Sequence, residues 1–181
     1  MFIGHLPAGY CLTTTLLKCF GCKDGTAYRR YLWIGLLASV LPDVDMIYFY
    51  WFDHRQHLHH SYWTHIPIYW ITGAYVLLSL GELFRSKALI WATSIGLANL
   101  IMHLILDSFA SKIRWLYPAS SAAYGLFQIP SRYGWWVWNY LFHWTFIIEV
   151  MIVLMAGYMF YYRHFMEHHK INIKGSVRTC G

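Results

Sequence analysis

Apolar residues gather in long runs along this chain, and short segments that hold most of the charged residues separate them. An α-helix needs about 20 mostly apolar residues to cross the hydrocarbon core of a bilayer, and most of the runs approach that length. The pattern therefore predicts an all-α integral membrane bundle with about five spans. The expected spans are residues 2–17, 31–52, 64–81, 88–110 and 135–162.

The composition supports a membrane-embedded chain and excludes an ordinary soluble domain. Of the 181 residues, 58% are hydrophobic and only 12% are charged, whereas a soluble domain carries roughly 25% charged residues. No linker rich in Pro, Gly or Ser divides the sequence. We therefore expect one membrane-embedded domain over residues 1–181, in which residues 163–181 form a basic cytoplasmic tail.

Basic residues are unevenly distributed between the two sides that these spans would create. The tail and the loops after the first and third expected spans hold ten Lys and Arg residues, and the other loops hold four. Because basic loops stay in the cytoplasm, this asymmetry predicts a multi-pass protein with a cytoplasmic C-terminus. The net charge of +6 then reflects loops facing anionic headgroups, and no nucleic-acid partner is expected.

Several ionisable residues lie inside the apolar runs or at their ends. Such a group costs about 2.5–3.5 kcal/mol at the centre of a membrane helix, so it usually faces the bundle interior and has a function. In the predicted topology all of them fall in the outer half of the bilayer, which predicts one shared site near the outer face. The candidates are His5, Asp43, Asp45, His60, His65, His103 and Asp107.

His103 and Asp107 are four residues apart in an expected helix, so their side chains share one face, one turn apart. An imidazole and a carboxylate placed in this way can bind one metal ion, or the carboxylate can bridge two. The alternative is a His–Asp pair that satisfies its own charge in the core. The spacing alone does not separate these two interpretations.

The segment Leu-Pro-Asp-Val-Asp at 41–45 interrupts the second expected span. Pro42 removes a backbone donor and disrupts the preceding turn. Asp43 and Asp45 repel one another unless a cation or a proton lies between them, which favours a metal site. The alternative is a helix end with Asp43 as the N-cap, although a cap accounts for only one of the two aspartates.

Five histidines fall within residues 54–65. His54, His57 and His59 are also typical of a solvated turn or a loose metal trap. His60 and His65 flank the start of a span, but five residues on an ideal helix turn them about 140° apart. Joint ligation therefore requires His60 to lie in the loop or on an unwound first turn.

Other residues near the expected outer face have more than one interpretation. His5 either completes the ligand set or is interfacial, and His143 and Glu149 are expected to have structural or outer-shell roles. Residues 113–138 are rich in Trp, Tyr, Pro and Gly, which predicts an irregular interfacial segment that forms the mouth of the site. Four basic residues could bind a substrate phosphate or anchor headgroups. They are Arg55, Lys112, Arg114 and Arg132.

The order of these motifs resembles the YdjM-type membrane-bound metal-dependent hydrolases of bacteria. The matching segments are Gly-His at 4–5, LPDVD at 41–45, HSYWTH at 60–65, HLILD at 103–107 and WLYP at 115–118. The sequence departs from the family pattern at Ser61, Tyr62 and Ile66, where the family has Arg, Gly and Ser. The family is distantly similar to zinc-dependent phospholipases C.

The resemblance implies a bacterial inner-membrane protein that binds one or more Zn²⁺ ions or another divalent metal. It implies six ligands, with His5 as an extra one. We expect a hydrolase acting on a phosphoester of a lipid or lipid-linked substrate at the outer face, with Asp43 or Asp45 as the base. The six implied ligands are Asp43, Asp45, His60, His65, His103 and Asp107.

Two other classes of function stay open at this point. A divalent-metal transporter or metal-binding membrane protein would handle the ion as cargo, and it would need ionisable groups in both leaflets. A structural scaffold would use the same residues as ion pairs in its core. The scaffold predicts that Asp43→Ala unfolds the protein when no metal is present.

Overall fold

The computed structural model describes residues 3–22, 25–54, 60 and 62–177. Within those residues the chain is helical and has no β-strand, and the single isolated β-bridge pairs Ile113 with Tyr124. The elements in order are α1 (His5–Cys19), α2 (Thr26–Val40), η1 (Leu41–Val44), α3 (Asp45–Trp51), η3 (Trp63–His65), α4 (Pro67–Leu83), α5 (Lys87–Ser108), α6 (Trp136–Leu141) and α7 (Thr145–Val177).

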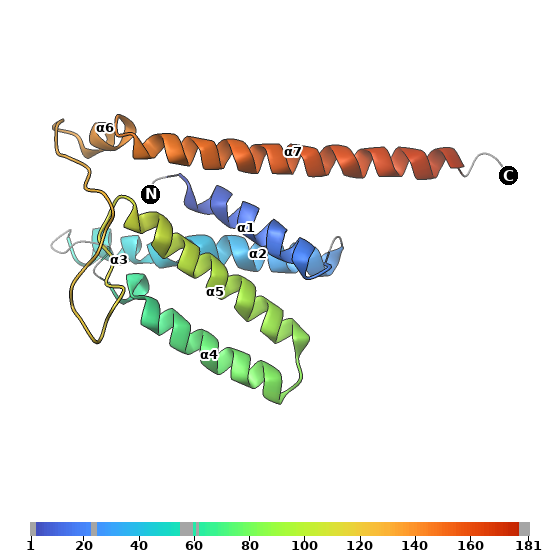
Figure 1. Ribbon diagram of the computed structural model, residues 1–181, viewed down its shortest axis with the longest axis horizontal. Helices are drawn as coiled ribbons and strands as arrows, with labels where there is room; N and C mark the ends of the chain where they lie inside the picture. Colours follow the sequence, from blue (N-terminus) through green and yellow to red (C-terminus); the bar gives the residue numbers. More distant parts are fainter. Residues whose placement is uncertain (1–2, 23–24, 55–59, 61, 178–181) are drawn as a thin grey trace.

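Helix α5 is central to the bundle, where it packs against α1, α2 and α4, and α7 packs along α1 (Figure 1). The helices alternate in direction along the chain. As a result, the beginnings of α1, α4 and α7 lie at the same end of the bundle as the ends of α2 and α5 (Figure 1). The fold therefore gathers at one end the residues that the sequence placed at one depth.

Small and polar residues let α1, α2 and α5 approach closely, as is common between membrane helices. A Cβ atom added to Gly9 would lie 2.5 Å from the Ser39 side chain, and one added to Gly35 would collide with Thr13. Asn99 donates from Nδ2 to Oγ1 of Thr13 at 3.0 Å. These contacts hold α1, α2 and α5 against one another.

Among the residues that the structure describes, three helical segments are long and apolar enough to cross a membrane, namely residues 26–51, 87–108 and 145–165. The first of them comprises α2, η1 and α3. The other two expected spans correspond to α1 and α4, which have 15 and 17 residues. At about 1.5 Å per residue they extend about 22 and 26 Å, less than the hydrocarbon core of about 30 Å.

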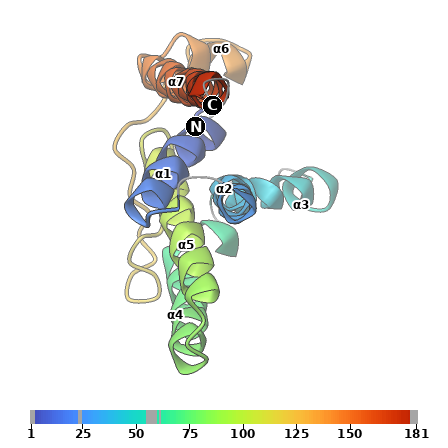
Figure 2. The same ribbon diagram turned by 90° about the vertical axis from the view of Figure 1, so that its right-hand side faces the viewer.

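The expected interruption of the second span is present. Helix α2 ends at Val40, and a 3₁₀ turn over Leu41–Val44 contains Pro42. Because proline has no N–H and clashes with the preceding turn, the α-helix cannot continue through it unchanged. Helix α3 then leaves the direction of α2 and projects to one side, away from α5 (Figure 2).

The last expected span, residues 135–162, is not one helix. Helix α6 ends at Leu141 and α7 begins at Thr145. Between them, Nδ1 of His143 lies 2.8 Å from Oγ1 of Thr145. The same Nδ1 atom accepts a hydrogen bond of 3.4 Å from the backbone N–H of Thr145. Such local bonds offer the backbone an alternative to a continuous helix. At the other end, α7 continues as helix to Val177, through much of the expected tail.

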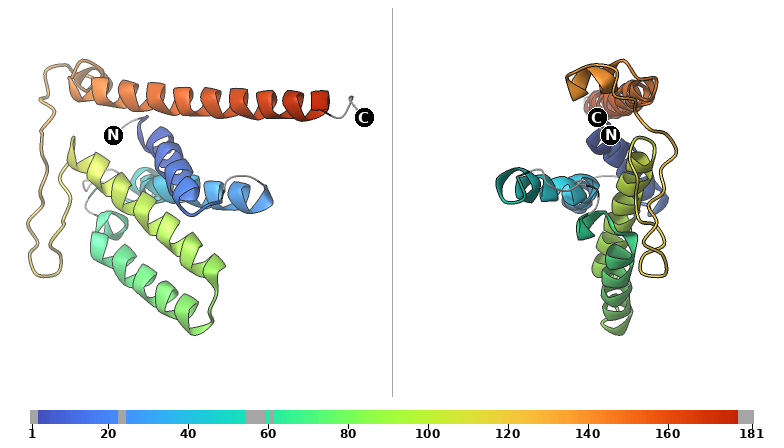
Figure 3. Two further views of the ribbon diagram at one scale, coloured as in Figure 1. Left: turned by 45° about the vertical axis from the view of Figure 1, so that its right-hand side comes forward. Right: turned by 90° about the vertical axis from the view of Figure 1, so that its left-hand side faces the viewer.

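The segment between α5 and α6 is irregular, as the composition of residues 113–138 predicted. It leaves the end of α5, turns back on itself and rises to α6 (Figure 3). The turn is tied by reciprocal backbone hydrogen bonds of 2.8 Å between Ile113 and Tyr124. This excursion lies at the same end of the bundle as the candidate site.

Candidate metal centre

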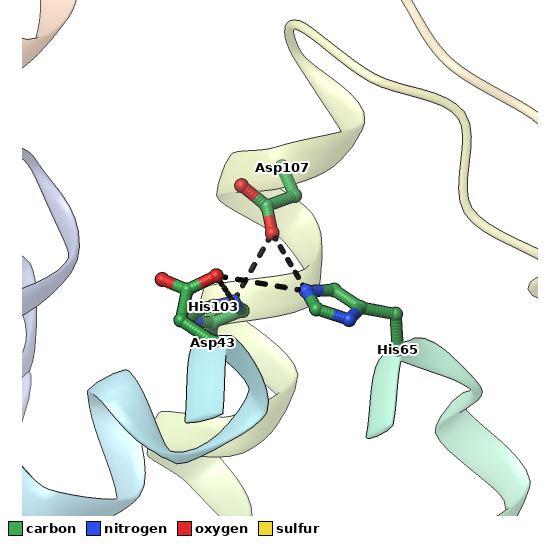
Figure 4. A group of neighbouring side chains, drawn as sticks. All are labelled: Asp43, His65, His103 and Asp107. Carbon is green, nitrogen blue, oxygen red and sulfur yellow. Dashed lines mark ion pairs between the residues drawn. The ribbon is translucent and has the colours of Figure 1, made fainter. Parts of the chain in front are cut away.

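Four side chains from three elements converge at this end of the bundle (Figure 4). Asp43 comes from η1, His65 from η3, and His103 and Asp107 from the last turns of α5. One ligand atom from each lies within 4.8 Å of the others. His65, His103 and Asp107 are at most 1% exposed, whereas the Asp43 side chain is 30% exposed. Three of the four side chains are thus buried, and the fourth, Asp43, is partly exposed.

The separations within this group match those between the ligands of a zinc ion. Zinc lies about 2.0–2.2 Å from its nitrogen and oxygen ligands, which places two tetrahedral ligands about 3.3–3.5 Å apart. Oδ1 of Asp43 lies 3.7 Å from Nε2 of His65 and 3.6 Å from Nε2 of His103. Oδ2 of Asp107 lies 3.5 and 3.1 Å from the same two nitrogens. These four atoms could hold one small cation.

The tautomer of each central histidine also suits a ligand. Nδ1 of His103 lies 2.8 Å from the carbonyl oxygen of Ser39, which can only accept, so Nδ1 carries the proton. In the neutral ring, Nε2 then directs its lone pair at the carboxylates. Nδ1 of His65 lies 2.9 Å from Oδ2 of the Asp45 carboxylate, so this Nδ1 also carries a proton. Lone pairs facing carboxylates repel, and either a proton on Nε2 or a metal cation between them removes the repulsion.

Asp45 lies behind His65 and is not one of the four converging ligands. Its Oδ2 accepts from the Oγ1 hydroxyl of Thr64 as well as from His65, and the residue is 8% exposed. The sequence led us to expect Asp45 as a ligand or a base. In the structure its carboxylate lies against Nδ1 of His65, a position from which it can orient that ring.

His5 and His60 approach the group from two further sides. Nε2 of His5 lies 3.2 Å from Oδ1 of Asp107, and its ring stacks on that of His103 with centroids 3.9 Å apart. Nε2 of His60 lies 3.4 Å from Oδ2 of Asp107. His60 precedes η3, so it lies off helix α4, as joint ligation with His65 required. The two oxygens of Asp107 therefore face different histidines.

Comparison with known proteins agrees with this arrangement of motifs. The model of the YdjM inner membrane protein family matches residues 1–171. The chain belongs to this family. No curated protein and no solved structure matches it. The family resemblance expected from the motif order is thereby confirmed.

The basic residues expected to bind substrate are not part of the converging group in this YdjM family member. Arg55 lies outside the described residues. Lys112 and Arg114 flank Ile113 in the segment after α5, and Lys112 is exposed. Arg132 is exposed and lines a pocket with His143. Within the described part of the chain, none of these three forms an ion pair with the four converging residues.

Sequence reasoning missed two partners of the YdjM site. Ser39 acts through its backbone carbonyl, which carries no sequence signal. Thr64 lies within the HSYWTH motif, directly before His65, and its hydroxyl bonds to Asp45. A hydroxyl residue next to a suspected ligand is a weak signal, because many such residues lie at helix starts without any site.

Proposed function

We propose that this YdjM family protein is a metal-dependent hydrolase that cleaves a phosphoester in a lipid or lipid-linked substrate. One observation carries the proposal: two carboxylates and two imidazoles from three elements converge, and three of these four side chains are buried. Zn²⁺ suits this nitrogen and oxygen donor set, and other divalent cations are compatible with it. Asp43, His65, His103 and Asp107 would hold the ion, with His5 and His60 adjacent to it.

The residues around the ion would have different roles in the reaction. The bound ion would polarise a phosphoryl oxygen and lower the pKa of a bound water to about 7. Asp43 is the better proton acceptor of the two aspartates, because its side chain is 30% exposed whereas Asp45 bonds to His65 and Thr64. Oδ1 of Asp43 faces His65 and His103, and its Oδ2 lies 3.8 Å from Nδ1 of His5.

The surroundings of the site support a substrate with a lipid headgroup. Large aromatic side chains are exposed on α3, η3 and the segment around α6, and Trp and Tyr prefer the boundary between headgroups and hydrocarbon. A site at this level would meet headgroups directly. Because the opposite loops carry most of the basic residues, we place the site at the outer face and the C-terminus in the cytoplasm. The exposed aromatic residues include Tyr48, Trp51, Trp63, Trp135, Trp138 and Trp144.

The test uses the full-length protein in mixed micelles. Metal is removed with a chelator, and Zn²⁺, Mn²⁺ or Co²⁺ is restored before incubation with phospholipids or a polyprenyl phosphate. We expect turnover that requires metal and is lost in Asp107→Asn. Protein that binds metal with full occupancy but hydrolyses none of these phosphoesters would overturn the proposal. Uptake of the divalent metal into proteoliposomes that contain the protein would instead identify a divalent-metal transporter.

A further inference from the structure

A carboxylate from the last long helix reaches the beginning of the first one. Glu149 lies in the second turn of α7 and is fully buried. Its Oε2 accepts from the backbone N–H of Ile3 at 2.6 Å and from that of Gly4 at 3.0 Å. A buried carboxylate in an apolar helix is costly, so these contacts indicate a role that offsets the cost.

The beginning of α1 has no cap of its own. Gly4 occupies the N-cap position and forms no side-chain cap, so nearby backbone N–H groups need an external acceptor. Glu149 supplies that acceptor, and its negative charge suits the positive end of the helix dipole. A Cβ atom at residue 4 would lie 3.3 Å from Cγ of Glu149, so the glycine leaves room for the carboxylate.

The capped position is directly joined to the metal centre. His5 follows Gly4, and its ring lies against Asp107 and His103. Helix α7 packs on α1, so Glu149 connects this outlying helix to the site. We propose that Glu149 is a positioning residue that holds the start of α1 so that His5 stays beside the metal ion. The consequence for metal binding rests on the proposed function, whereas the capping of α1 does not.

Two measurements on the full-length protein in detergent test this inference. Hydrogen exchange of the N-terminal peptide reports the capping directly and needs no metal. A competition titration with a chelator reports the affinity for Zn²⁺. The variants are Glu149→Ala and the isosteric Glu149→Gln, which keeps one oxygen acceptor. Glu82→Gln, on an exposed part of α4, is the matched control.

In Glu149→Ala we expect the amides of residues 3 and 4 to exchange at least about tenfold faster. The affinity for Zn²⁺ should fall by about tenfold, the lower end of the range for partners outside the ligand set, because His5 contacts the proposed ligands Asp107 and His103. Glu149→Gln should lie between this variant and the parent, and Glu82→Gln should match the parent. If Glu149→Ala does not fold, Glu149→Gln and Gly4→Ala, which crowds the carboxylate, decide the result.

The outcomes separate this inference from the proposed function. Unchanged exchange at residues 3 and 4 in a folded variant overturns the capping role. Faster exchange with unchanged zinc affinity overturns the positioning of His5 and leaves the metal centre intact. A parent protein that binds no zinc overturns the proposed function, and the exchange data then support or overturn the capping of α1 alone.

Discussion

Asp45 offers the sharpest test of the site, because the sequence and the structure give it different roles. The sequence predicts that it is a metal ligand or a base, whereas in the structure its Oδ2 lies 2.9 Å from Nδ1 of His65. If it orients His65, Asp45→Asn should weaken zinc binding without abolishing it. Loss of an outer-shell partner of this kind typically lowers metal affinity by about 10- to 100-fold. That range corresponds to about 1.4–2.8 kcal/mol of binding free energy.

The assay is a competition titration of the purified protein with chelators of graded affinity, together with direct measurement of bound zinc. Asp107→Asn serves as the ligand variant, because its Oδ2 lies within 3.5 Å of three histidine nitrogens. It should lose zinc altogether under conditions where Asp45→Asn still binds one equivalent. Asp53→Asn, two residues beyond α3, is the matched control and should bind as the parent does.

Two results would refute this assignment. If Asp45→Asn lost zinc as completely as Asp107→Asn, Asp45 would be a ligand and the bond to His65 would not describe the metal-bound protein. If Asp45→Asn and Asp45→Ala both bound zinc as tightly as the parent, the carboxylate would have no influence on His65. Intermediate affinity is the only outcome that agrees with its position behind the ring.

The remaining predictions concern stability and topology. Removal of metal with a chelator should lower the midpoint of thermal unfolding. Zinc at 100 times its Kd should then raise the free energy of unfolding by about 2.7 kcal/mol. Equal midpoints with and without metal would argue against a native metal centre. Gly9→Ala should cost about 1–3 kcal/mol, measured by unfolding with denaturing detergent, because the new Cβ meets Ser39 at 2.5 Å. Gly96→Ala, where no atom lies within 4 Å, is its control, and equal losses in both variants would contradict this account of the helix contact. A fluorescent protein fused to the C-terminus should fluoresce and a periplasmic phosphatase fused there should be inactive; the reverse pattern would invert the proposed orientation.

Local sequence patterns predicted much of this protein because they depend only on short-range geometry. The i, i+4 spacing of His103 and Asp107 places both side chains on one helix face, whatever surrounds that helix. Pro42 breaks α2 for a reason internal to its own backbone. Apolar length and the low content of charge likewise indicated helices in a membrane without reference to any neighbour. The helical class, the break at 41–45 and the family membership were therefore accessible from the chain alone.

Contacts between distant elements were decided only by the tertiary structure. Asp43 and Asp45 are two residues apart and chemically alike, but Asp43 lies in the 3₁₀ turn and faces the converging histidines, whereas Asp45 begins α3 and faces Nδ1 of His65. The bond from Gly4 to Glu149 joins residues 145 positions apart, and no local pattern indicates it. Periodicity describes which face of a helix a residue occupies. Which helix that face meets depends on packing, and at this site packing separates the carboxylate that faces the candidate metal position from the one that lies against Nδ1 of His65.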